Sequence, residues 1–254
     1  MARLQELLER RAYACRLTPD RALESLDEAE AFLRDRGLLT RTTDCALPSL
    51  YDACHEEPYA AGKAGFAQWP KTKWPWFGAL EQRPGTYRLH VHRGKHLLVT
   101  DAVAAILDPI CRSELARTEA SDPRWALVLR HLADAGPSTT EDLCTELGFK
   151  PKDLKKIRSP LERCGAVVTR WVDVHDATVE LARWDQVYTE PSASGGIRDL
   201  VVAGVRAAVV APEGELRRWF SWRWLWDDAL VDALVAEGRL ERVDGHVTAA
   251  ERAS

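Results

Sequence analysis

Seven basic residues gather between Lys150 and Arg170, a stretch that contains only two acids. The basic residues are Lys150, Lys152, Lys155, Lys156, Arg158, Arg163 and Arg170. The apolar residues Leu154, Ile157, Leu161 and Cys164 recur at helical spacing, which predicts a helix with one buried face. The lysines then point away from that face, as is typical of a helix that contacts DNA phosphates. A solvated basic face on an ordinary helix is the alternative interpretation.

Pro160 interrupts this segment and should kink the helix, or restart it with Ser159 as a new cap. We therefore expect the side chains before Pro160 to lie nearest DNA. The segment carries lysines rather than the Arg, Asn or Gln that usually read base edges, so it predicts weak sequence preference.

A second basic segment, rich in aromatic residues, lies between Gly62 and His96, where Glu81 is the single acid. The candidate DNA contacts in it are Lys71, Lys73, Trp74 and Trp76. Exposed aromatic rings among basic residues suit stacking on unpaired bases or wedging into a duplex. The alternative is that these rings anchor a core, since aromatic side chains are usually buried.

Residues 86–100 read as a β-hairpin whose tip, Arg93-Gly94-Lys95, would present Arg93 and Lys95 to phosphates. Alternation places His90 and His92 on one face, and a three-residue loop would set His96 opposite His92. Three imidazoles could bind zinc. Since no carboxylate or thiolate lies close in sequence, histidines that bond to phosphate or to the protein are favoured, and neither a metal nor a cofactor is predicted.

The helix and strand signals divide the chain into three parts. We expect an N-terminal helical and hairpin region over 1–118, a winged-helix module over 119–188 and a second one over 196–250, with a linker rich in Pro, Ser and Gly over 189–196. The predicted fold is α+β and mainly helical, with tandem winged helix-turn-helix modules and small hairpin wings. The expected helices cover 20–36, a short stretch after Pro48, 74–82, a stretch ending at Gly136, 140–147, a stretch opened by Pro151, 197–210, 213–220 and 227–237. The hairpin turns are expected at His175-Asp176 and Asp244-Gly245. The helix over 227–237 carries acids and no base, so this last module is expected to be structural.

Composition limits the class of protein. The chain has 254 residues, a formal net charge of −4 and six cysteines with no CxxC pair, which we interpret as reduced thiols in the core. No apolar run approaches the roughly 20 residues of a membrane span, and the first residues do not resemble a signal peptide. We expect a cytoplasmic monomer with no membrane partner, because no dimerisation helix is evident.

The stretches GPSTTEDLCTELGFKPKDLKKIRSPLERCGAVVTR, PSLYDAC, WPWFGAL and LHVHRGKHLLV resemble the AlkZ (YcaQ) superfamily, in particular its AlkZ-related branch. The resemblance implies tandem winged helices and DNA as the partner. The family's characterised enzymes are DNA glycosylases that remove bulky alkylated bases and unhook crosslinks. Their catalytic motif is glutamine, any residue, then glutamine or aspartate. Thr40-Arg41-Thr42 is the nearest match here, and threonine can neither act as a carboxylate base nor offer an amide to water. Asp44 is a weak substitute, which leaves enzymatic activity open.

The sequence thus predicts a DNA-binding protein that recognises duplex or damaged DNA. The alternatives are a DNA glycosylase with an altered site, a transcriptional regulator, and a protein-interaction scaffold without a DNA role. No glycine-rich phosphate loop, GxSxG or HExxH motif points to other chemistry.

Overall fold

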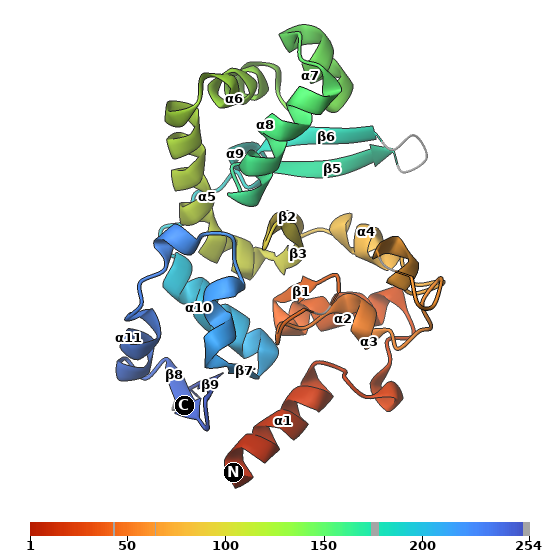
Figure 1. Cartoon of the computed structure of the whole chain (residues 1–254), viewed down its shortest axis with the longest axis vertical. Coiled ribbons are helices and arrows are strands. Elements are labelled where there is room, and N and C mark those ends of the chain that lie inside the picture. Colours follow the sequence, from red (N-terminus) through yellow and green to blue (C-terminus); the bar gives the residue numbers. More distant parts are fainter. Residues whose placement is uncertain (43, 64, 174–177, 251–254) are drawn as a thin grey trace.

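The computed structural model describes residues 1–42, 44–63, 65–173 and 178–250. It confirms a mainly helical α+β fold with three small antiparallel sheets (Figure 1). Each sheet has three strands in the same arrangement, in which the last strand in sequence lies between the other two: β1-β3-β2, β4-β6-β5 and β7-β9-β8. None of the helices within the described residues is long and apolar enough to cross a membrane.

The first part of the chain builds the first sheet. Its elements are α1 (Ala2–Ala14), α2 (Leu26–Arg36), β1 (Leu38–Thr40), α3 (Leu50–Ala53), α4 (Trp76–Glu81), β2 (Thr86–His92) and β3 (Lys95–Thr100), with 3-10 turns at Pro19–Arg21 and Gly65–Gln68. The helix expected over 20–36 begins only at Leu26, because the Ser25 hydroxyl accepts from the Glu28 amide and starts the helix there. The helix expected over 74–82 is also shorter, because it begins after Pro75.

A long helix that the sequence analysis missed, α5 (Asp101–Ser121), follows directly on β3. It contains Pro109 and links the first sheet to the middle part of the chain (Figure 1). Its apolar residues are interrupted by Asp108 and Glu114, which are buried, so the usual alternation of buried apolar and exposed polar residues is blurred. The helix extends past residue 118, and the three predicted domain ranges stay predictions.

The middle part contains the basic helix. Its elements are α6 (Pro123–Ala135), β4 (Ser138–Thr139), α7 (Thr140–Leu147), α8 (Pro151–Arg163), β5 (Val167–Asp173), β6 (Thr178–Arg183) and α9 (Trp184–Val187). Helix α7 begins with a capping box between Thr139 and Asp142. Helix α8 runs through Pro160 without restarting, since the proline lies in its last turn. The apolar face expected on α8 is buried as predicted. The expected turn at His175-Asp176 lies outside the described residues.

The last part repeats the arrangement with shorter helices. Its elements are α10 (Ile197–Ala208), β7 (Val210–Pro212), 3-10 turns at Glu213–Arg218 and Arg223–Leu225, α11 (Leu230–Ala236), β8 (Leu240–Val243) and β9 (His246–Ala249). The helix expected over 213–220 is therefore a 3-10 helix, and the one expected from Asp227 begins at Leu230. The predicted Asp244-Gly245 turn is confirmed, with both residues at positive φ.

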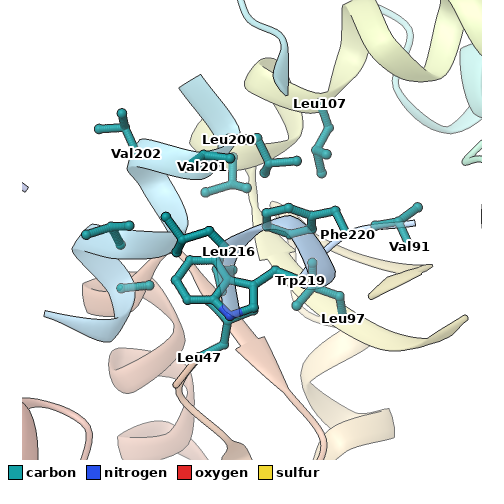
Figure 2. Packing of buried hydrophobic residues seen from close by; sticks show 14 of the residues in the cluster. Leu47, Val91, Leu97, Leu107, Leu200, Val201, Val202, Leu216, Trp219 and Phe220 are labelled. Atoms are coloured by element: carbon teal, nitrogen blue, oxygen red, sulfur yellow. The ribbon is translucent and has the colours of Figure 1, made fainter. Parts of the chain in front are cut away.

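The largest hydrophobic cluster joins the first and last parts of the chain. Figure 2 shows Trp219 and Phe220 between residues of α10, such as Leu200, and residues of the first sheet, such as Leu97. The Trp222 indole donates to the Cys164 carbonyl at 2.9 Å and so connects this core to the end of α8. Five of the six cysteines are buried and all six are unpaired, as predicted. Of the aromatic residues before α11, Trp219, Phe220 and Trp222 are buried in packing, whereas Trp224 is exposed.

Asp108 of α5 is fully buried and holds three segments together. Its carboxylate accepts from Arg112 at 2.8 Å, from the Trp184 indole at 2.7 Å and from the Ser192 amide at 2.8 Å. It thereby fixes α9 and the following linker against α5.

Replacing this carboxylate should destabilise the protein. Asp108→Ala leaves the buried Trp184 and Ser192 donors unpaired and is expected to lower the free energy of unfolding by about 2 to 4 kcal/mol, measured by urea denaturation. Asp134→Ala, an exposed acid on α6, is the control and should change it by less than about 0.5 kcal/mol. Equal effects from the two variants would contradict this role for Asp108.

Candidate nucleic-acid interface

The N-terminal half of α8 presents a row of free cations to solvent. Lys150, Lys152, Lys155 and Lys156 are exposed, whereas Leu154 and Ile157 on the opposite face are buried. An exposed ion pair between Lys156 and Asp153, at 3.5 Å, is the main internal contact in this row, and such pairs hold a side chain weakly. These lysines can therefore turn towards phosphates at little cost.

The C-terminal half of α8 lies against β2 of the first part. The Arg158 side chain is 24% exposed and faces Glu162 at 3.4 Å, so it is engaged within the protein. Arg163 is exposed but packs over the hairpin turn, where a Cβ on Gly94 would come within 2.7 Å of its Nε. At a rise of about 1.5 Å per residue, Lys152 lies about 16 Å along the helix from Arg163. The predicted DNA contacts on α8 thus form two groups: exposed lysines at its N-terminal end, and arginines packed against the first part of the chain at its C-terminal end.

Arg170 is exposed on β5 and lines a pocket of about 280 Å³ at the junction of the first and middle parts. Glu81 and Arg88 line the same pocket, so the one acid of the basic aromatic segment lies beside two guanidinium groups.

The basic aromatic segment contributes mostly to a core. Trp74 and Trp76 are half-buried against the second hydrophobic cluster, and the Tyr51 hydroxyl donates to the Trp74 carbonyl at 2.7 Å. The Lys73 ammonium donates to the Leu23 carbonyl at 2.7 Å and is 17% exposed, whereas Lys71 is exposed. Two other aromatic residues of this region, Tyr59 and Phe66, are the exposed ones, at 61% and 47%. The sequence analysis did not single them out, and only their lysine- and glycine-rich surroundings could have drawn attention to them.

The β2–β3 hairpin has a two-residue turn, with Arg93 and Gly94 at positive φ and His92 paired with Lys95. The expected three-residue loop is wrong, and an irregularity between Leu89 and His92 turns the histidines apart. The rings of His90 and His96 are tilted against each other with centroids 4.0 Å apart, while the buried His92 bonds through Nδ1 to the Trp219 carbonyl. The three imidazoles therefore do not converge on one point.

Asp44 lies at the hairpin tip, where three side chains approach its carboxylate. Its two oxygens accept from Lys95 at 2.7 Å and His92 at 2.9 Å, and Arg93 is 3.4 Å away. Burial acts to raise the pKa of Asp44, but the hydrogen bonds from Lys95 and His92 outweigh it and bring the pKa to about 2. The carboxylate is ionised, and each of its two oxygens already has a partner, which makes it a poor base towards water. Arg93 and Lys95 are in turn partly neutralised.

The stretch Thr40-Arg41-Thr42 does not present a polar pair to solvent. Thr40 is 1% exposed and its hydroxyl donates to the Pro48 carbonyl. The Arg41 guanidinium lies 4.1 Å from the centre of the Trp69 ring. Burial lowers the pKa of Arg41. The stacked cation thus stands at the position where the motif allows any residue, and threonines stand at the two positions that would carry the amide or carboxylate.

Ionisable side chains gather where α4 and β2 meet α8 and β5. Arg88 is 6% exposed, donates to the Thr169 carbonyl at 2.9 Å and lies 3.1 Å from Glu81. His90 lies 3.6 Å from Glu162. Within the described residues, five of the seven buried side-chain polar atoms without a hydrogen-bond partner belong to this junction, on Glu81, Arg88, His96 and Arg158. Such clustering marks a candidate functional or strained site.

Burial dominates the ionisation of this junction. It raises the pKa of Glu81 to about 7, although Arg88 acts in the opposite direction. It also lowers the pKa of His90 to about 4 and, with His90 as a neighbour, that of His96 to about 2. Both imidazoles are therefore neutral near pH 7, while Glu81 titrates there. In the sequence, Glu81 stands out only as the single acid among the basic residues of 62–96, and this pattern does not reveal its burial.

The fold is shared with a solved DNA glycosylase. The DNA glycosylase AlkZ of Streptomyces sahachiroi superposes with a TM-score of 0.59 at 14% sequence identity, over 98% of this chain and 70% of the enzyme. No family model matches the chain, and no curated protein does. The chain has the AlkZ fold.

The buried acid of this AlkZ-fold chain makes its stability depend on pH. Because the pKa of Glu81 rises from 4.5 to about 7 on folding, the folded chain binds the proton more tightly between these values. The contribution of Glu81 to stability is therefore greatest in acid and is lost as the pH rises towards 7.

Glu81→Gln removes this titration. Urea unfolding of both proteins at pH 5, 6, 7 and 8 should show the wild type losing stability relative to the variant as the pH rises. Glu141→Gln, an exposed acid of α7, is the control and should follow the wild type. A stability difference between the wild type and Glu81→Gln that is constant over this range would rule out the shift.

Proposed function

We propose that the protein binds duplex DNA as a tandem winged-helix protein and that the exposed end of α8 is its main phosphate contact. The observation that carries the proposal is the row Lys150, Lys152, Lys155 and Lys156, which is free to solvent in a chain of net charge −4. Isolated positive surfaces on acidic proteins favour polyanionic partners.

The fold supports DNA as that polyanion, because the AlkZ of Streptomyces sahachiroi is a DNA glycosylase. The end of α8 next to β2 is packed, so DNA would meet the helix near Lys152 and not near Arg158. Lysines bond to phosphates as point charges and rarely read base edges, which favours binding with weak sequence preference. Among the other predicted contacts, Lys71 and Arg170 are exposed, whereas Lys73, Trp74 and Trp76 are engaged in packing.

Base excision is the second candidate, favoured by the same fold. Two observations weigh against it: Thr40 is buried and Asp44 is held by three neighbours. At the α4–α8 junction, burial raises the pKa of two further acids, Glu81 and Glu162, which makes them the alternative candidates for a base. A DNA-binding protein without excision activity fits the geometry best.

Removing the lysines should weaken DNA binding in a salt-dependent way. In fluorescence anisotropy with a labelled duplex, Lys152/Lys155/Lys156→Ala should lower the slope of log K against log salt by about 2 to 3, since each phosphate contact contributes about 0.9. The change should be the same for duplexes of unrelated sequence.

The matched control removes three exposed arginines elsewhere, in Arg34/Arg124/Arg130→Ala, with the same loss of charge. This control should keep the wild-type slope. If both variants lost the same amount of DNA affinity, the effect would come from net charge alone and not from the position of the lysines. If the wild type did not bind DNA at low salt, the proposal would be overturned.

Abasic-site formation separates the two candidate functions. Incubation with DNA carrying bulky N7- or N3-alkylated purines, followed by alkaline cleavage, should yield no strand breaks above the level without protein. Strand breaks that disappear in Glu162→Gln, but persist in Asp44→Asn, would instead assign excision to the junction acids.

A further inference from the structure

Three potential metal ligands meet beside the tip of the β2–β3 hairpin. An oxygen of Asp44, the Cys45 sulfur and an imidazole nitrogen of His92 all lie within 4.8 Å of one another. Asp44 and Cys45 are consecutive, whereas His92 comes from the end of β2. Such spacing suits the edges of a tetrahedral site once bonds of about 2.0 to 2.3 Å form to a central ion.

His92 is oriented as a metal ligand usually is. The side chain is 1% exposed, and Nδ1 lies 2.6 Å from the Trp219 carbonyl oxygen. A carbonyl can only accept, so Nδ1 carries the hydrogen and Nε2 is the nitrogen directed at Asp44. A backbone carbonyl that fixes the second ring nitrogen is the usual outer partner of a metal-bound histidine.

The two oxygens of Asp44 have separate partners. One faces His92 Nε2 at 2.9 Å, and the other accepts from Lys95 at 2.7 Å, with Arg93 at 3.4 Å. An ion beside the first oxygen would leave Lys95 and Arg93 in place on the second. Burial raises the pKa of the Cys45 thiol to about 12, although the Leu47 backbone N–H acts in the opposite direction, so an ion that binds the sulfur has to displace its proton.

We propose that Asp44, Cys45 and His92 bind a divalent metal ion of the zinc type. Oxygen, thiolate and imidazole ligands together are typical of zinc and of its substitute cobalt, rather than of magnesium or calcium. This assignment does not depend on the proposed DNA binding.

Binding exchanges protons for the ion. A divalent ion forms bonds to Nε2, Sγ and an Asp44 oxygen, and the proton of the Cys45 thiol and any proton on Nε2 are released to solvent. The negative charges of the Asp44 carboxylate and the Cys45 thiolate then balance the two charges of the ion.

A pocket lies beside Cys45. Cys45 lines a pocket of about 250 Å³ together with Glu215 and His246, on the side where α1 meets the last sheet. Three protein ligands leave a fourth position for water in a zinc site. The ion would connect the loop after β1 with the hairpin, whose His92 is already tied to the Trp219 segment.

Metal titration of the full chain tests the site. After treatment with EDTA, addition of Co²⁺ should give a thiolate-to-cobalt charge-transfer band that saturates at a single equivalent, and Zn²⁺ should displace it. Cys45→Ser should abolish the band, and Asp44→Asn should weaken Zn²⁺ binding at least tenfold, measured by calorimetry. Circular dichroism confirms that each variant is folded.

Two control variants separate this site from others. Cys144→Ser removes a half-buried thiol of α7, and His96→Ala removes one ring of the adjacent His90–His96 pair, so both should bind as the wild type does. Absence of a charge-transfer band in the wild type would overturn the proposal. Loss of binding in His96→Ala with retention in Cys45→Ser would assign the metal to the His90–His96 pair instead.

Discussion

The packing of α8 and β5 against β2 is the constraint on which the rest of the structure depends. Arg88 is buried in this junction and its guanidinium donates to the Thr169 carbonyl of β5. A buried guanidinium is costly unless it is bonded and paired, and here Glu81 and Glu162 supply the opposite charge. The same contact decides which end of α8 is covered. The C-terminal end of α8 therefore packs against β2, whereas its N-terminal end exposes lysines to solvent.

The last part of the chain packs against the first sheet and the end of α8. Trp219 and Phe220 fill the space between α10 and the first sheet, and Trp222 reaches the carbonyl at the end of α8. Gly165, at positive φ, is required where this indole and Cys111 approach the backbone, because a Cβ would lie 2.6 Å from the Cys111 sulfur. Helix α11 contains one acid, Asp232, and its apolar residues Leu230, Val231 and Leu234 are buried, which is consistent with a packing role.

Electrostatics separate the two basic regions that look alike in the sequence. The lysines at the start of α8 have weak partners, whereas Arg93 and Lys95 are held by Asp44, and Arg93 also donates to the Arg218 carbonyl at 2.6 Å. A basic hairpin tip that is partly neutralised contributes less to phosphate binding than its composition indicates. The same contacts engage Asp44, the carboxylate nearest in sequence to Thr40-Arg41-Thr42.

The sequence by itself determined the helices with strong local signals: α6, α7 and α8 follow from apolar spacing, the Thr139 cap and Pro151, and the Asp244-Gly245 turn from its residue types. It also determined that the lysines of α8 are exposed, because burial of the apolar face turns the opposite face of the helix to solvent. Only the tertiary structure decided that Arg158 is covered, that His90 and His92 diverge, and that Asp44 and Cys45 meet His92. The physical reason is that these outcomes depend on a hairpin irregularity and on contacts between residues about 50 or more positions apart, for which local periodicity carries no information. Helix α5 was missed for a related cause, since its buried acids are stabilised by partners, such as Trp184 and Trp224, that come from the later modules.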